Sequence, residues 1–217
     1  MDLEIWSDIV CPFCYIGKRH LDIALSRFEY RNEVRVTWKS FELDPSAARD
    51  PQQNVYEMLS KKYGQSLEWA KQMTEQVTQK GAAVGLYFDF DRLIRTPSFD
   101  AHRLSHLAAK HQLQDLAQER LFAAHFTDGK DIADPKVLER IGAELGLDPR
   151  EVQHLLAEGD YRSEVRREEQ EASSLGVTGV PFFLFNRKYA ISGAQPVEVF
   201  IGAFQTVLKE QRAESNG

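Results

Sequence analysis

The two cysteines of the chain, Cys11 and Cys14, lie in the stretch SDIVCPFCYIG (7–17) and are separated only by Pro12 and Phe13. Thiols at this spacing can form a redox-active dithiol, supply half of a tetrahedral metal site, or close a structural disulfide. A disulfide across two residues closes a very short loop and constrains the unfolded chain weakly. A chain of 217 residues can also bury a full core without it. The spacing therefore favours redox chemistry or metal binding.

A zinc site on the two cysteines would need two further ligands, and the chain contains no second CxxC pair. His102 and His106, in AHRLSH, would share one face of a helix. They lack the glutamate that follows the first histidine of a zinc-protease helix. We interpret them as part of a partly buried helix face, and we expect no resident metal.

The residues around the cysteines predict a strand followed by a helix. LEIW (3–6) is an apolar run rich in residues that favour strands. Apolar side chains follow helical spacing from Cys14 onward, and Pro12 suits the first helical turn. Cys11 would then lie at a helix N-terminus, where unpaired N–H groups and the helix dipole favour a thiolate, with Cys14 more buried. VRVTWKSF (34–41) alternates and predicts the next strand.

The middle of the chain has the pattern of consecutive helices. Two are expected over 55–64 and 67–81, each closed by a glycine. LYFDF (86–90) is interpreted as an extended segment that either packs in the core or lines a pocket, and core packing is the favoured interpretation. Further helices are expected to start at Thr96-Pro97, at Asp134-Pro135, and at Asp148-Pro149, where Glu151 is in a capping-box position. Another helix is expected over 113–126.

Strand signals return in the last quarter of the chain. PFFLF (181–185) and KYAIS (188–192) are joined by Asn186-Arg187, which predicts a hairpin. Residues 199–208 carry apolar side chains at helical spacing and predict an amphipathic closing helix. The predicted element order is βαβ, a helical block, and ββα.

The composition argues against several classes of function. A formal net charge of −6 gives no indication of nucleic-acid binding, and the arginines at 162, 166 and 167 are interleaved with glutamates. No apolar run approaches the roughly 18 residues of a membrane span. MDLEIW (1–6) lacks the basic and apolar regions of a secretory signal. We therefore expect a cytoplasmic protein without membrane or nucleic-acid partners, in a compartment where paired thiols are more often catalytic than structural.

Together these motifs resemble the thioredoxin superfamily. A CxxC helix, followed by GVTGVPFF (176–183), a hairpin and a final helix, is similar to that fold, and the helical block is similar to the DsbA family. SDIVCPFCYIG, TPSFDAHRL (96–104), and VTGVPFFLF with YAISGAQP resemble the FrnE-type thiol oxidoreductases. The chain departs from that group at Phe13, where tryptophan is frequent, and at TPS (96–98), where Asn-Thr is the usual pattern. The second departure puts a substrate role of that loop in question.

The resemblance implies an α/β protein with a thioredoxin-like fold and a large all-helical insertion. Residues 1–44 and 176–217 would form a discontinuous thioredoxin-like domain, and residues 45–175 the helical insertion domain. It also implies Cys11 as the nucleophile and Cys14 as the resolving thiol. The residues that would contact substrate are Pro12, Phe13, Val180 and Pro181, the last two forming a cis-proline site.

The implied activity is thiol-disulfide exchange with protein, peptide or small-molecule thiols and disulfides. No cofactor is implied beyond the redox-active Cys11–Cys14 disulfide, and glutathione is a candidate co-substrate. Asp8 either caps the turn before Cys11 or acts as a proton relay, and capping is the favoured interpretation. Lys18 and Arg19 are expected to be exposed to solvent.

Two other functions are compatible with the motifs. The related kappa-type glutathione transferases and hydroxychromene carboxylate isomerases share this topology and activate the glutathione thiol at the matching helix N-terminus. They carry serine where Cys11 stands and usually lack the second cysteine. A non-enzymatic metal-binding or interaction protein would use the cysteine pair as ligands, and its metal content and thiol count would distinguish it from the enzymes.

Overall fold

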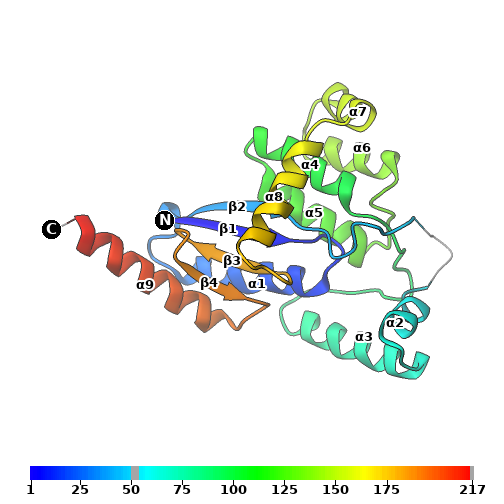
Figure 1. Cartoon of the computed structure of the whole chain (residues 1–217), viewed down its shortest axis with the longest axis horizontal. Helices are drawn as coiled ribbons and strands as arrows, with labels where there is room; N and C mark the ends of the chain where they lie inside the picture. Colours follow the sequence, from blue (N-terminus) through cyan, green and yellow to red (C-terminus); the bar gives the residue numbers. More distant parts are fainter. Residues whose placement is uncertain (50–53, 216–217) are drawn as a thin grey trace.

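A computed structural model describes residues 1–49 and 54–215 of the chain. Four strands form one mixed sheet in the order β2-β1-β3-β4 (Figure 1). Strand β1 pairs parallel with β2 and antiparallel with β3, and β3 and β4 form an antiparallel hairpin. The strands are β1 (Asp2–Ser7), β2 (Arg35–Ser40), β3 (Phe182–Phe185) and β4 (Tyr189–Ser192).

Helix α1 and a short 3-10 turn connect β1 to β2, α9 follows β4, and α2 to α8 lie between β2 and β3 in the chain (Figure 1). This order confirms the predicted βαβ, helical block and ββα. No helix in the described ranges is both long and apolar enough to span a membrane. The helices are α1 (Pro12–Arg27), a 3-10 turn (Arg31–Glu33), α2 (Val55–Tyr63), α3 (Leu67–Ala82), α4 (Phe99–Lys110), α5 (Gln114–Phe126), α6 (Pro135–Glu144), α7 (Pro149–Glu158), α8 (Arg162–Ser174) and α9 (Val197–Ser215).

Both faces of the sheet are covered by helices. Successive side chains of a strand point to opposite faces, so Ile5 and Trp6 of β1 enter different clusters. Ile5 packs with Phe183 of β3 and with Phe200 of α9, on the face that α1 also covers. Trp6 packs with Ala172 of α8 on the other face. The central strand β1 is therefore enclosed, and the loop that leaves its C-terminal end leads directly to Cys11.

A second core lies between α1 and the helical block. Cys14, Tyr15 and Ile16 of α1 belong to this core, together with side chains of α4, α5 and the segment 86–90. The Tyr15 ring stacks on Phe122 of α5 with a centroid distance of 4.9 Å. The face of α1 that carries the cysteines is thus held by the helical block rather than by the sheet. The interpretation of 86–90 as a core segment is confirmed.

Local capping signals placed two helix starts correctly. The Asp134 carboxylate accepts a hydrogen bond from the Lys136 amide at 2.9 Å, and Asp148 accepts one from the Arg150 amide at 2.8 Å. Glu151 does not complete a capping box, because it pairs with basic residues at the end of α4. The predicted capping of α6 and α7 is confirmed, whereas the reciprocal bond from Glu151 is not formed.

The predicted helix start at Thr96-Pro97 is wrong. Helix α4 begins at Phe99, with Ser98 as its N-cap. The buried Thr96 hydroxyl instead donates a hydrogen bond to Asp131 Oδ1 at 2.6 Å. The Thr96 side chain, which local capping rules assigned to the helix N-terminus, is thus hydrogen-bonded to a residue far along the chain. Helix α3 also ends one residue later than predicted.

The expectation that Lys18 is exposed is wrong as well. Its side chain is 3% exposed, and its Nζ lies 3.1 Å from Asp22, 3.2 Å from Asp115 and 3.6 Å from Glu119. Burial disfavours the charged form, but these carboxylates favour it more strongly, so the pKa of Lys18 is raised. Arg19 is partly buried and donates to Glu119 Oε1 at 2.7 Å. The two cations therefore fasten the active-site helix α1 to α5.

Candidate active site

Cys11 is the N-cap of α1, and Pro12 is the first residue of the helix. The Cys11 carbonyl accepts hydrogen bonds from the Cys14 amide at 3.0 Å and the Tyr15 amide at 3.4 Å. The Cys11 side chain thus lies at the positive end of the helix dipole, where a negatively charged sulfur is favoured. This placement agrees with the geometry expected from the first-turn proline.

Both cysteines are free thiols, so the structure describes the dithiol form. Cys11 is 5% exposed and lines a cleft, whereas Cys14 is fully buried and is not among the residues that line it. Burial, followed by the neighbouring Cys11, raises the pKa of the Cys14 thiol well above its usual value. Cys11 therefore carries the thiol that a ligand in the cleft can reach. Cys14 carries a buried, protonated thiol.

The Val180–Pro181 peptide bond is cis and lies beside the cysteines. The Cys11 thiol donates to the Val180 carbonyl oxygen, with Sγ and O 3.7 Å apart. Phe13 projects to the surface and is 36% exposed, and Lys80 Nζ lies 5.6 Å from its ring centroid. Val180 therefore contacts the Cys11 sulfur, Pro181 follows Val180 in the chain, and Pro12 and Phe13 line the cleft with Cys11.

Close packing of Gly17 holds Pro181 in place. A Cβ atom at Gly17 would lie 3.0 Å from Pro181 Cγ and 3.2 Å from Phe183 Cζ. We expect Gly17→Ala to lower the free energy of unfolding by about 1–2 kcal/mol, because overpacking outweighs the gain in helix propensity. Displacement of Pro181 should also slow disulfide exchange. Urea unfolding and exchange rates on the same preparation measure both effects.

Gly202 is the matched control for this substitution, because it lies in α9 and a Cβ there would meet nothing within 4 Å. Gly202→Ala should leave exchange unchanged and stabilise the protein by up to about 1 kcal/mol. A stable Gly17→Ala variant with wild-type exchange would contradict the role of this contact.

Asp8 is fully buried at the turn between β1 and α1. Its Oδ2 accepts a hydrogen bond from the Leu43 amide at 2.7 Å, and its Oδ1 accepts one from the Val10 amide at 3.3 Å. Its backbone carbonyl accepts from the Cys11 amide at 3.1 Å. The carboxylate thus caps the turn, and it also holds the loop after β2 against the cysteines.

Two histidines near Asp8 were not assigned to the site from the sequence. His102 is buried, and its Nε2 lies 3.5 Å from Asp8 Oδ1 without a hydrogen bond to any described residue. His125 of α5 lines the same cleft, and burial lowers its pKa to about 4. His106, one turn after His102, pairs with Glu168 at 3.1 Å instead. The four-residue spacing in AHRLSH was the available signal, since it put both histidines on one face of α4.

The described residues contain no group of three or more histidine, cysteine or acidic side chains arranged to hold a metal ion. His102 and His106 instead contact carboxylates in two different parts of the fold: Asp8 in the turn before α1 and Glu168 in α8.

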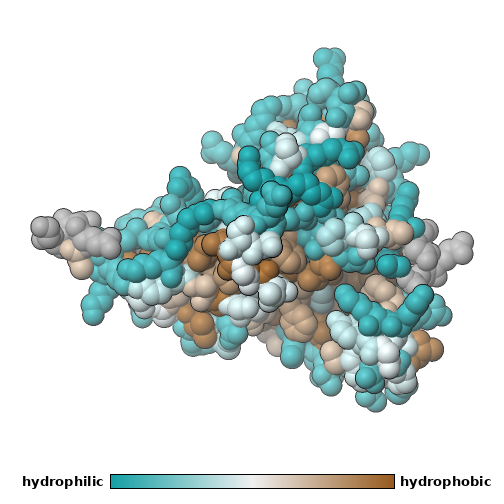
Figure 2. Space-filling model, in the orientation of Figure 1, coloured by the Kyte–Doolittle hydropathy of each residue, from teal (hydrophilic) through white to brown (hydrophobic). Residues whose placement is uncertain are grey.

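A cleft of about 740 Å³ opens over Cys11. In Figure 2, hydrophobic residues gather in the middle of the molecule, above the block formed by α2 and α3. The cleft is lined from α1 and its preceding turn (Asp8, Val10, Cys11, Pro12, Phe13), from 43–47 (Leu43, Asp44, Ala47), from α2 (Val55, Met58, Leu59, Lys61, Lys62, Tyr63), from α3 (Trp69, Met73, Thr74, Val77), from 90–98 (Phe90, Leu93, Ile94, Arg95, Thr96, Ser98) and from α5 (His125, Phe126).

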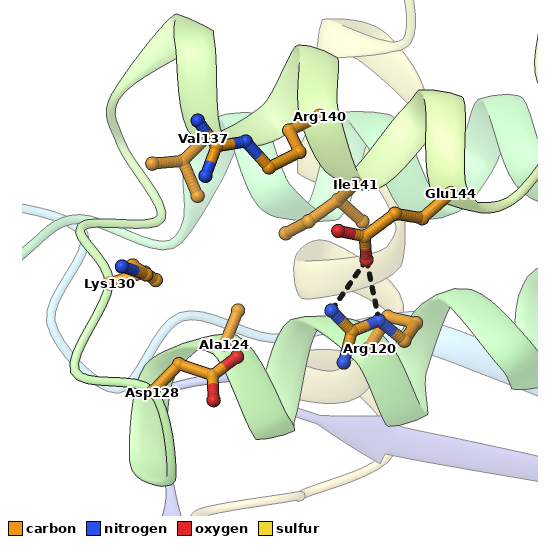
Figure 3. A pocket seen from close by; sticks show the side chains of 8 residues that line it. All are labelled: Arg120, Ala124, Asp128, Lys130, Val137, Arg140, Ile141 and Glu144. Carbon is orange, nitrogen blue, oxygen red and sulfur yellow. Dashed lines mark hydrogen bonds and ion pairs between the residues drawn. The ribbon is translucent and has the colours of Figure 1, made fainter.

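A smaller hollow of about 110 Å³ lies between α5 and α6 (Figure 3). There Arg120 donates to Glu144 Oε2 from Nε at 2.9 Å. Neither cysteine lines this hollow, and it shares no lining residue with the cleft over Cys11. The cleft is therefore the candidate active site.

Comparison with known proteins matches residues 2–205 to the family model described as DSBA-like thioredoxin domain. The uncharacterized protein YwbO of Bacillus subtilis (strain 168) is 27% identical over 211 residues, covering 96% of this chain and 98% of the relative. A probable DsbA oxidoreductase from Streptomyces coelicolor is similar in structure, with 41% identity and a TM-score of 0.91 over 97% of this chain and 91% of that chain.

More distant solved structures share the fold. The cytosolic disulfide reductase DsbM from Pseudomonas aeruginosa has 20% identity and a TM-score of 0.65, over 96% of this chain and 99% of that chain. A 2-hydroxychromene-2-carboxylate isomerase has 14% identity and a TM-score of 0.73, over 99% and 98%. At these identities the likeness concerns the fold alone.

Proposed function

Because this chain belongs to the DSBA-like thioredoxin domain family, a family of thioredoxin-like fold, we propose that it catalyses thiol-disulfide exchange through Cys11 and Cys14. The observation that supports this most directly is the asymmetry of the pair. Cys11 lies at the N-terminus of α1 and lines the cleft, while Cys14 is fully buried and is not among the residues that line it. A nucleophile that is reached by substrate and a second thiol that is not are the two parts that exchange through a mixed disulfide requires.

In the proposed reaction, the Cys11 thiolate attacks one sulfur of a disulfide R–S–S–R′. A Cys11–S–S–R bond forms, and R′–S⁻ leaves and takes up a proton. The Cys14 thiol then loses its proton and attacks the Cys11 sulfur, so that the Cys11–Cys14 disulfide forms and R–S⁻ leaves. The substrate gains two electrons and the protein loses two. The reverse sequence oxidises a dithiol, and the direction follows the potential of the partner.

Asp8 is the proposed proton acceptor for Cys14. The buried Cys14 thiol is protonated at neutral pH, so a base must take its proton before it attacks. Asp8 lies three residues before Cys11, lines the same cleft, and is within 3.5 Å of His102 Nε2. The capping bonds hold the carboxylate in this position, so capping and proton transfer are compatible roles for one side chain.

Pro12, Phe13, Val180 and Pro181 are the proposed substrate contacts. Pro12 and Phe13 line the cleft beside Cys11, and Val180 accepts the hydrogen bond of the Cys11 thiol in the dithiol form. A substrate sulfur that bonds to Cys11 would therefore come to lie between the start of α1 and the Val180–Pro181 backbone.

Glutathione is the proposed low-molecular-weight partner, and the cytoplasm the proposed compartment. A structure of the cytosolic disulfide reductase DsbM with GSH has the same fold, at 21% identity and a TM-score of 0.62. The 2-hydroxychromene-2-carboxylate isomerase has the same fold, so glutathione-dependent isomerisation is a second candidate function. The presence of two thiols in this chain favours exchange over isomerisation, because isomerisation needs no resolving thiol.

Redox titration against a series of reduced and oxidised glutathione tests the proposal. We expect a single two-electron transition from the dithiol, which has two free thiols, to the internal disulfide, which has none. For such a transition, a tenfold change in the equilibrium constant corresponds to about 30 mV in potential. Quenched samples alkylated and weighed by mass spectrometry give the thiol count. Two protein thiols that stay free across the whole series, while reduced glutathione binds without forming a disulfide, would instead support the isomerase alternative.

A further inference from the structure

The cleft over Cys11 is apolar and rich in aromatic side chains. Trp69 and Tyr63 form one wall, with ring centroids 5.4 Å apart, and Phe90 and Phe126 form another, with centroids 6.3 Å apart. Sites for small molecules are clefts of roughly 300–1,000 Å³ with this kind of lining. The volume of about 740 Å³ lies within that range.

Cys11 lines this cleft but is itself almost completely buried. Only 5% of the residue is exposed. A residue with so little exposed surface is poorly accessible to a disulfide held on the surface of a folded protein. A small disulfide can enter the cleft whole, and its substituent can then occupy the apolar walls.

The charges of the cleft favour an anion. Lys61 and Lys62, in the last turn of α2, are exposed and line the cleft. Of the acidic residues that line it, Asp8 is buried and accepts two backbone hydrogen bonds, and Asp44 lies 3.7 Å from Arg95. Arg95, with a smaller effect from Lys62, thus offsets the charge of Asp44, and the exposed Lys61 and Lys62 add further positive charge to the lining of the cleft.

We propose that the substrate of this site is a low-molecular-weight disulfide that carries an aromatic or other large apolar group and a carboxylate. This rests on the proposed thiol-disulfide exchange. The sulfur binds at Cys11, the apolar group lies between the two aromatic walls, and the carboxylate lies at Lys61 and Lys62. The exchange step is the one written above, with a thiol such as glutathione returning the Cys11–Cys14 disulfide to the dithiol.

Four disulfides separate the two features of the proposed substrate. They are 5,5′-dithiobis(2-nitrobenzoate), which is aromatic and anionic; 4,4′-dithiodipyridine, which is aromatic and neutral; 3,3′-dithiodipropionate, which is aliphatic and anionic; and cystamine, which is aliphatic and cationic. The second-order rate of each with the reduced full-length protein is divided by its rate with 2-mercaptoethanol, which removes the intrinsic reactivity of the disulfide. We expect the aromatic anion to have the highest normalised rate and cystamine the lowest, at least about tenfold apart at low salt.

Two variants locate the selectivity. The double substitution Lys61→Gln and Lys62→Gln should lower the normalised rates of the two anions by about fivefold, and leave dithiodipyridine unchanged. Met73→Gln, on the exposed edge of the α3 wall, should lower the rates of the two aromatic probes by a few-fold, through lost apolar contact. Lys136→Gln in α6 and Leu116→Gln in α5 are the matched controls, since both side chains are exposed and neither lines the cleft.

The outcomes distinguish this inference from the proposed function. If Cys11 reacts with none of the four disulfides, thiol-disulfide exchange itself is wrong. If it reacts with all four at equal normalised rates, exchange stands and the substrate class is overturned. Basic side chains in a last helical turn also stabilise a helix, so a lysine variant that melts early and slows every probe alike would overturn the anion site. A disulfide-linked peptide that reacts faster than the aromatic anion would overturn the small-molecule assignment.

Discussion

Replacing Cys11 with serine is expected to abolish disulfide exchange, while replacing Cys14 with serine should leave a reactive thiol that accumulates mixed disulfides. Among the described residues, the first variant lacks the one cysteine thiol that lines the cleft. The second retains that thiol but has no second thiol to release the bound partner. Turnover with a small disulfide and thiol, followed by mass spectrometry of the trapped protein, measures both results.

These two variants control for each other, because each removes one sulfur and keeps the other. Serine is a favoured N-cap residue, so Cys11→Ser should preserve the start of α1 and melt near the wild-type temperature. In the reduced wild-type protein, a limiting amount of iodoacetamide should modify Cys11 first. Preferential alkylation of Cys14, or turnover by a folded Cys11→Ser variant, would reverse the assignment of roles.

Asp8→Asn is expected to slow the resolving step by about 10²-fold at neutral pH, the scale of a lost general base. Because burial raises the pKa of Cys14, its thiol is protonated at neutral pH and needs an acceptor. As the pH rises towards that pKa, hydroxide removes the proton directly, and the deficit of the variant should shrink. The measurement is the pH profile of the second, unimolecular phase after Cys11 has reacted.

Asp44→Asn is the matched control for this prediction, because it removes the same charge from the same cleft. Asp44 is an exposed side chain that pairs with Arg95 and Ser46 rather than with the turn that holds Cys11. Its pH profile should follow that of the wild type. Asparagine at position 8 also loses one of two accepted backbone hydrogen bonds, so a thermal melt accompanies the rates. A rate deficit that stays constant with pH and tracks the loss of stability would assign Asp8 to capping alone.

Short-range signals in the sequence predicted most of the elements that carry the site. An apolar run of strand-favouring residues located β1, and Pro12 located the start of α1 with Cys11 at its N-terminus. Asn186 and Arg187 both adopt positive φ in the turn of the predicted β3–β4 hairpin. Each of these signals depends on residues within one helical turn or one hairpin, so it can be read without knowledge of the rest of the chain.

Long-range partners decided the features that local rules assigned wrongly. Thr96 donates to Asp131 rather than capping α4, and Lys18 is buried against Asp115 of α5 instead of facing solvent. These pairs join residues that are 35 and 97 positions apart. Their side chains are equally suited to a helix cap or to solvent, and only the packing of α1 against the helical block determines which alternative has the lower free energy.

The same division holds within the candidate site. The sequence identified Cys11, Cys14, Val180 and Pro181 by motif, but His102 reaches Asp8 only because α4 packs behind the turn that precedes α1. The cleft has walls from six segments of the chain, and no stretch of sequence contains more than a part of it. Reactive groups and their immediate backbone are properties of local sequence. Burial, pairing and the shape of a cavity depend on which distant surfaces meet, and that is determined by the tertiary fold.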